Sequence, residues 1–277
     1  MVRGVDEQRP LENLLNESVV TLKQYFSLVD TIARLSLKAE ARRYYFGFWW
    51  WVIEPLLYVA VFYIVFEQLL GSRTPDFLMF LIVGKFTFIW FSKTVNYAGN
   101  SLVANAGLIG RMDLPKTLFP MAVILECTYR QSAVFALLGV ALIIDGHLPN
   151  AYWLWVLPLI AVEALLIVLC GFIASVLVCI KRDFALLINL GMLFLLFMSG
   201  VFWDLNAIGN QATQDAVLFW NPVAFLLHSF RQALLWQQTP DLSHLMGLTL
   251  FLSCGLVLVA KGMSRYRYYL AQRVVTT

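Results

Sequence analysis

Six long apolar runs alternate with shorter polar segments along this chain. A helix needs about 20 mainly apolar residues to cross a bilayer, because lipid offers no partner to an unpaired backbone group. The pattern therefore predicts an all-α, polytopic membrane protein with six transmembrane helices. We place these spans at Phe48–Leu70, Phe77–Thr94, Leu118–Ile144, Tyr152–Ile180, Phe184–Phe202 and Leu245–Met263.

The segment before the first run, Leu14–Tyr45, carries apolar residues at helical spacings of three or four, with charged residues between them. Beside a membrane, this stripe predicts an amphipathic helix in the cytoplasmic interface, its basic face toward anionic head groups. Aromatic residues follow at once and are typical of an interfacial belt. Contact of some of these rings with substrate is the alternative. The rings are Tyr44, Tyr45, Trp49, Trp50 and Trp51.

Two other segments do not read as simple spans. Residues 95–117 are too polar for lipid but predict a short amphipathic helix ending near Gly110, suited to docking on a partner protein. A solvated connector is the alternative. Phe219–Trp236 is apolar but too short and too charged to cross, which predicts paired re-entrant helices covered by protein or facing water.

Only 13% of the 277 residues are charged and 60% are hydrophobic, whereas soluble domains carry about 25% charged residues. The net charge of +3 is too small to suggest a nucleic-acid partner. We divide the chain into a cytoplasmic segment with the interface helix (1–47), a six-span domain (48–263) and a cytoplasmic tail (264–277).

Basic residues predict the orientation. Sixteen of the 20 Lys and Arg residues fall on one side of the predicted spans, so the positive-inside rule places both termini in the cytoplasm. We expect a multi-pass protein of the cytoplasmic (inner) membrane. The sixteen are Arg3, Arg9, Lys23, Arg34, Lys38, Arg42, Arg43, Lys93, Arg111, Lys116, Lys181, Arg182, Lys261, Arg265, Arg267 and Arg273.

Five ionisable residues lie within or near spans: Glu54, Lys85, Glu126, Arg130 and Glu163. A charge at the bilayer centre costs about 2.5–3.5 kcal/mol on insertion scales, so these groups should face protein or water. Glu126 and Arg130 are four apart on one helix and predict a structural ion pair.

Signatures of chemistry are missing from the sequence. There is no GxxxxGK[ST] phosphate loop, no GxSxG or HExxH motif, and the three histidines are dispersed. The four cysteines lie in apolar runs without metal-ligand spacing. We therefore expect no enzyme activity, no metal site and no cofactor in this chain.

Four segments, in order, resemble the membrane (permease) subunits of type-two ABC exporters, above all those that export O-antigen, capsular polysaccharide or teichoic acid. Two departures are that Phe48 replaces the family's usual Leu after Gly47, and that Ser199-Gly200 replaces the more frequent Ser-Pro. The segments are FGFWWWVIEPLL (46–57), NSLVANAGLIGRMDLPKTLFP (100–120), CIKRDFALLINLGMLFLLFMSGVFW (179–203) and LFWNPVAFLLHSFRQALL (218–235).

The resemblance implies a half-transporter. Two copies would form a homodimer around one pathway, each engaging one of two copies of a cytoplasmic ATPase that binds ATP and Mg. The cargo would be a lipid-linked polysaccharide, O-antigen first, on undecaprenyl diphosphate or another lipid. The residues expected to couple to the ATPase are Asn100, Leu102, Asn105, Leu108, Ile109, Met112 and Pro115.

The resemblance also implies a substrate route lined by aromatic rings, since sugars present apolar CH faces. Ordinary helix packing or lipid contact is the alternative for each ring. Arg34, Arg42 and Arg43 could attract the lipid diphosphate at the cytoplasmic entrance, against simple positive-inside anchoring. The expected channel rings are Trp50, Tyr58, Phe62, Phe194, Phe197 and Phe202.

Other functions stay open at this point. A type-two exporter of drugs or other small molecules shares the same mechanics. An ion-coupled carrier would use Glu54, Lys85, Glu126 and Arg130. A membrane-embedded glycolipid enzyme is disfavoured, because no cluster suits acid–base chemistry.

Overall fold

The computed structural model describes residues 21–43, 45, 47–65, 76–112 and 114–276. Across these residues the chain consists of helices joined by turns and short loops, and this part contains no β-strand. The all-α prediction is therefore confirmed for the residues described.

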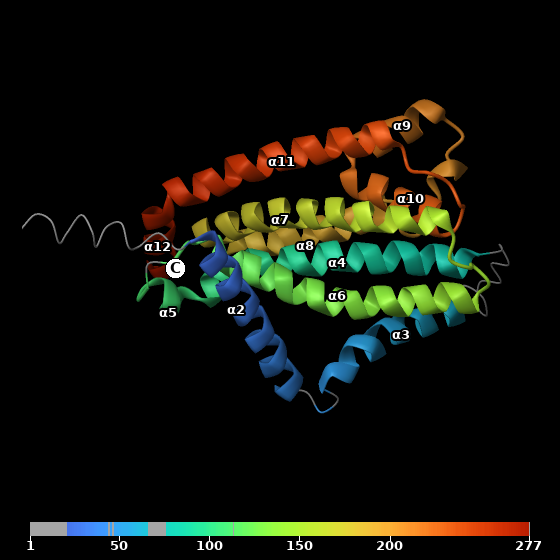
Figure 1. Ribbon diagram of the computed structural model, residues 1–277. Helices are drawn as coiled ribbons and strands as arrows, with labels where there is room; N and C mark the ends of the chain where they lie inside the picture. The colour runs from blue at the N-terminus through green and yellow to red at the C-terminus, as the bar shows by residue number, and fades with distance from the viewer. Residues whose placement is uncertain (1–20, 44, 46, 66–75, 113, 277) are drawn as a thin grey trace, which may run out of the picture.

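Within the described residues, four helices are long and apolar enough to cross a membrane, by length and composition. They lie side by side, with α4 along both α6 and α7, and α11 against α7 (Figure 1). α4 is buried on most of its surface because its sequence is apolar nearly all round. The four are α4 (Phe77–Ala104), α6 (Leu118–Ile144), α7 (Val156–Ile180, after a 3₁₀ turn at Ala151–Trp155) and α11 (Leu242–Arg265).

The first and fifth predicted spans correspond to shorter apolar helices. α3 (Trp50–Phe62) continues in helical turns to residue 65, and the rest of the predicted span falls outside the described residues. α8 (Asp183–Met198) has 16 residues and ends before Gly200, whose φ of +71° suits glycine. Phe202 therefore lies beyond the helix rather than at its end.

α4 is longer than the span predicted from sequence, which ended at Thr94. Small residues continue its buried face, since Ala98 and Gly99 pack closely on Gly171 and Ala174 of α7. The polar residues beyond Thr94 do not end the helix, because amide groups such as that of Asn100 donate to carbonyls one turn earlier. The separate amphipathic helix shrinks to α5 (Ala106–Ile109).

Three amphipathic elements gather at one end of the helices, and two others at the opposite end (Figure 1). The first end holds α5, α2 (Leu22–Arg43) and α12 (Arg267–Thr276). α12 lies in the segment predicted as a cytoplasmic tail (264–277), and buried Leu270 and Val274 hold it against the other helices. Residues 14–20 of the predicted interface helix lie outside the described part.

The opposite end holds two short helices between α8 and α11, α9 (Gln211–Trp220) and α10 (Pro222–Leu234). Asn221 caps α10 by accepting bonds from two backbone N–H groups, and Pro222 occupies the first turn. α10 is mostly buried against α4 and α7. The pair has the lengths expected of re-entrant helices, and their depth in a membrane stays a prediction.

Candidate functional site

Aromatic rings from two predicted spans gather around Lys85 of α4. Its Nζ lies 5.6 Å from the ring centre of Tyr58 on α3 and 6.0 Å from that of Phe202, which follows α8. Phe202 in turn contacts Phe62 edge-on at 6.3 Å and Phe197 at 5.7 Å. Four of the six expected channel rings thus form one cluster, here called the Lys85 cluster.

The other two expected channel rings lie elsewhere. Trp50 is partly exposed and lines a cavity nearer the end where α2 lies. Phe194 is 65% exposed on α8, outside the Lys85 cluster. It belongs to an apolar row on the uncovered face of this helix, which also includes Leu186, Leu187, Leu190, Leu193 and Phe197.

A cavity of about 270 Å³ lies where α2, α3, α4 and α6 meet. Its wall combines aromatic rings with paired charges and with Gln131, whose amide donates to the backbone carbonyl of Phe86. This mixture of apolar ring faces and polar oxygens can contact a sugar as well as a hydrocarbon. The rings are Trp50, Trp51, Tyr58 and Tyr97, and the charged residues are Glu40, Glu54, Lys93 and Arg130.

Charges in this cavity compensate one another across helices. Arg130 Nη1 donates to both carboxylate oxygens of Glu40 at 2.8 Å, and Nη2 donates to Glu126 at 3.0 Å. Lys93, at the end of the span predicted from sequence, lies inside the longer α4 and pairs with Glu54. The Glu126–Arg130 contact was anticipated from spacing. Glu40 and Lys93 were missed as partners, because sequence spacing cannot show which helices cross.

α2 is fastened to α6 by further polar contacts. Tyr129 of α6 donates to Asp30, and Tyr25 donates to Thr117 at 3.2 Å. The hydrogen bond from Tyr129, followed by that from Arg34, holds the pKa of Asp30 below its usual value. Arg34, predicted at the diphosphate entrance, is thus already paired with Asp30 at 2.9 Å.

The other two arginines of the predicted entrance, Arg42 and Arg43, lie at the end of α2. Arg42 is exposed on the last turn of α2. The side chain of Arg43 lies outside the described part of the structure. The diphosphate role of all three arginines stays a prediction.

The predicted coupling residues divide into exposed and buried sets. Leu108 and Met112 are about half exposed, whereas Leu102 and Ile109 are buried. Leu102 is buried because α4 extends through it, and Ile109 belongs to α5, which packs on α12. The coupling role of the whole set stays a prediction. Asn100 is exposed, and Asn105 and Pro115 are partly buried.

At the opposite end, Arg231 of α10 joins three elements. Its side chain is 1% exposed and donates to the carbonyls of Phe80 (3.2 Å), Gly200 (2.7 Å) and Val201 (3.1 Å). The guanidinium carbon also lies 3.4 Å from the centre of the Phe80 ring. Asn221 adds a second tie to the end of α8 through Ser199 Oγ at 3.0 Å.

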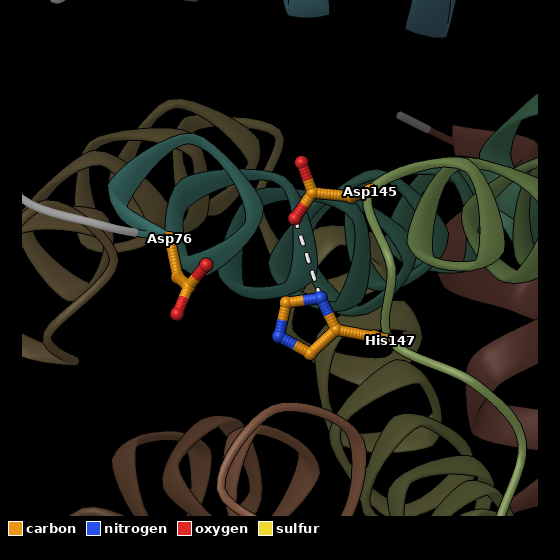
Figure 2. Close-up of side chains that lie close together, drawn as sticks. All are labelled: Asp76, Asp145 and His147. Carbon is orange, nitrogen blue, oxygen red and sulfur yellow. Dashed lines mark ion pairs between the residues drawn. The ribbon is translucent and has the colours of Figure 1, made fainter.

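A small cluster of possible metal ligands also lies at this end of the helices. Figure 2 shows Asp76, Asp145 and His147, whose ligand atoms lie within 4.8 Å of one another. His147 Nδ1 is 3.2 Å from Asp145 Oδ2. Both carboxylates are exposed, and the cluster does not by itself define a metal site. The sequence analysis did not predict this cluster, since Asp76 precedes α4 whereas Asp145 and His147 follow α6, about 70 residues later in the chain.

Three known proteins with similar sequences carry the same name. The chain is 24% identical over 208 residues to the O-antigen export system permease protein RfbA of Klebsiella pneumoniae, covering 75% of this chain and 80% of that protein. A second K. pneumoniae protein of that name is 25% identical over 207 residues, covering 74% and 79%. The RfbA of Myxococcus xanthus is 24% identical over 230 residues, covering 82% and 87%. No protein-family profile matches the chain.

Proposed function

We infer that this chain belongs with the O-antigen export permeases and is the membrane subunit of an ATP-driven ABC exporter of a lipid-linked polysaccharide. The observation that carries this conclusion is the similarity to three permeases over about three quarters of the chain or more. The apolar helical architecture and the lack of a phosphate loop agree with a membrane subunit that relies on a separate ATPase. O-antigen is the first cargo, with capsule or teichoic acid as further possibilities.

The proposed topology has six spans in the inner membrane. α3 lies in the first of these spans and α8 in the fifth. Both termini face the cytoplasm, together with α2, α5 and α12, which lie at the end richest in Lys and Arg (Figure 1). The chain then divides into a cytoplasmic segment (1–47), a transmembrane domain (48–263) and a tail (264–277).

The working unit is a homodimer bound to two copies of the ATPase, which holds ATP and Mg. Leu108 and Met112 are the apolar contacts offered to the ATPase, since both side chains are half exposed beside α5. The exposed apolar faces of α3 and α8 form the walls of the pathway between the two copies.

The substrate route passes the Lys85 cluster. Stacking on rings such as Tyr58 and Phe202 tolerates sliding, because it uses ring faces rather than fixed hydrogen bonds. Lys85 would add a positive charge for the diphosphate of the lipid anchor, taken here as undecaprenyl diphosphate. Arg34, Arg42 and Arg43 mark the cytoplasmic entrance in this proposal.

Co-purification tests the exporter assignment. The full chain, extracted in mild detergent from its own cells, should retain an ATPase. Deletion of the chain should remove the glycan from the cell surface while lipid-linked glycan accumulates inside. An absence of ATPase together with normal surface glycan would overturn the proposal.

The two alternatives give different outcomes. An exporter of small molecules would leave surface glycan normal on deletion and change drug sensitivity instead. An ion-coupled carrier would work in vesicles on a proton gradient alone. The structure offers the carrier few free groups, because Glu54, Glu126 and Arg130 are all in ion pairs.

A further inference from the structure

A second cavity, of about 430 Å³, lies at the end of the molecule where α7 and α11 finish. Its wall is almost entirely apolar, with side chains from α7, α11 and α12. We call it the α7–α11 groove. Its lining includes Ile173, Leu177, Val259, Gly262, Met263 and Leu270.

Two tyrosines indicate where the mouth of this groove lies relative to the membrane surface. Tyr266 and Tyr269 also line it, and about half of each residue is exposed. Tyr is enriched where hydrocarbon meets head groups, because the ring is apolar and the hydroxyl is polar. The mouth of the groove thus has the chemistry of the membrane–water boundary.

Four exposed cations flank the groove on two sides. Lys181 and Arg182 directly follow α7, and Lys261 and Arg265 occupy the last turns of α11. No ion pair joins any of these four to an acidic group in the part of the chain that the structure describes. The nearest acid in sequence is Asp183, which begins α8. The flanks therefore carry a net positive charge.

We propose that the α7–α11 groove binds one acyl chain of an anionic glycerophospholipid, with the phosphate held by the flanking cations. Neither feature suffices alone: the apolar wall accepts any hydrocarbon chain, and the cations attract any anion. Their combination selects an amphiphile with a negative head group, as basic pockets between membrane helices do. The inference does not depend on what the protein transports.

A glycine inside the groove supplies a direct test. A Cβ built at Gly262 meets no atom within 4 Å, so a larger side chain there would enter the groove without clashing with the protein. Gly247, on the same helix but outside the groove, is also open to space. Gly262→Leu and Gly247→Leu are therefore matched in helix, residue type and expected gain in helix propensity.

The measurement is native mass spectrometry of the full chain in mild detergent, titrated with phosphatidylglycerol or phosphatidylcholine of identical acyl chains. Wild type and Gly247→Leu should retain phosphatidylglycerol in preference to phosphatidylcholine. Gly262→Leu should bind phosphatidylglycerol about tenfold more weakly, since displacing only two buried methylenes has that effect.

A second variant tests the head-group contact. Lys261→Gln combined with Arg265→Gln should reduce the preference for phosphatidylglycerol while phosphatidylcholine binding stays constant. A thermal melt of each variant checks that the protein is folded. The proposal is overturned if Gly262→Leu binds like wild type, if the two lipids bind equally to wild type, or if undecaprenyl phosphate binds there and the phospholipids do not.

Discussion

Gly84 of α4 leaves the space that the guanidinium of Arg231 occupies. A Cβ at position 84 would lie 2.2 Å from Arg231 Nη2, well inside van der Waals contact. The arginine cannot swing aside freely, because three backbone carbonyls and the Phe80 ring hold it. The absence of a side chain at one position therefore allows a buried cation to join α4, α10 and the end of α8.

Substituting Gly84 by Ala should destabilise the protein. We expect a loss of about 2–3 kcal/mol, since the new methyl either displaces the guanidinium from its carbonyls or pushes α10 outward. Gly139→Ala on α6 is the matched control, as its Cβ would meet nothing within 4 Å. Denaturation of the purified protein in detergent measures the difference, and equal stability of the two variants would contradict this account.

Replacing Arg231 by Lys tests whether charge alone suffices. An ammonium on a single stem cannot reach the three carbonyls that the planar guanidinium contacts. We expect Arg231→Lys to lower the melting temperature by an amount close to Arg231→Met. A Lys variant as stable as wild type would show that the positive charge is sufficient and that the several N–H donors of the guanidinium are not needed.

The tie between α2 and α6 should depend on Asp30. Tyr129→Phe removes the hydrogen bond to Asp30, so α2 should become more mobile. A spin label at exposed Leu35 on α2 reports this as a narrower spectrum. Ser132→Ala is the control on α6, because that hydroxyl bonds only within its own helix. An unchanged spectrum in Tyr129→Phe would show that the hydrogen bond between Tyr129 and Asp30 does not restrain α2.

The same contact has a definite pH dependence. The pKa of Asp30 is lowered in the folded protein, so the contribution of this carboxylate is fully present above its ordinary pKa of 3.8. It is lost as the pH falls through the lowered, folded-state pKa. The label at Leu35 should therefore keep one spectrum from pH 7 to pH 5 and loosen only in stronger acid. Loosening near pH 6 would point to another group.

Coupling to the ATPase should require the two exposed apolar residues beside α5. Leu108→Asp combined with Met112→Asp should abolish co-purification of the ATPase, because charge is introduced into the proposed contact. Leu148→Asp is the control, because this leucine is also exposed but lies at the opposite end of the helices. Retention of the ATPase by the double variant would move the docking site elsewhere.

Export should also depend on the Lys85 cluster. Tyr58→Ala and Phe202→Ala remove ring faces that the substrate is proposed to pass, so surface glycan should fall several-fold at constant protein level. Phe251→Ala is the control, since that ring is exposed and lies on α11, which contributes no residue to the Lys85 cluster. Equal export by all three variants would assign these rings to ordinary packing.

Much of the helical framework could be predicted from the sequence, because an apolar run long enough to cross a bilayer is a strong signal of a membrane-spanning helix. The boundaries of α6 match the prediction, and those of α7 and α11 lie within a few residues of it. The span predicted for α4 was too short because polar residues near Asn100 suggest a loop. In the structure the Asn100 side-chain amide donates a hydrogen bond to the carbonyl of Asn96 within the same helix. α12 was missed because a short helix anchored by two side chains gives a weak pattern.

The candidate site was harder to predict, because it depends on which helices cross. Spacing on one helix identified Glu126 and Arg130, but not Glu40, which comes from α2. Arg231 lies in the segment predicted to be re-entrant, and its carbonyl partners at Phe80 and Gly200 come from parts of the chain that sequence alone does not bring together. The aromatic residues of spans one and five were identified by resemblance, and the structure brings four of them together.

In the proposed function, this chain forms a conduit for lipid-linked glycan while a separate ATPase supplies the energy. Inside-out membrane vesicles with radiolabelled lipid-linked O-antigen on their outer face allow this division of roles to be measured. The account predicts transfer of the label to the lumen only when this chain, the ATPase and ATP are all present. Transfer driven by a proton gradient without ATP, or by this chain alone, would contradict it.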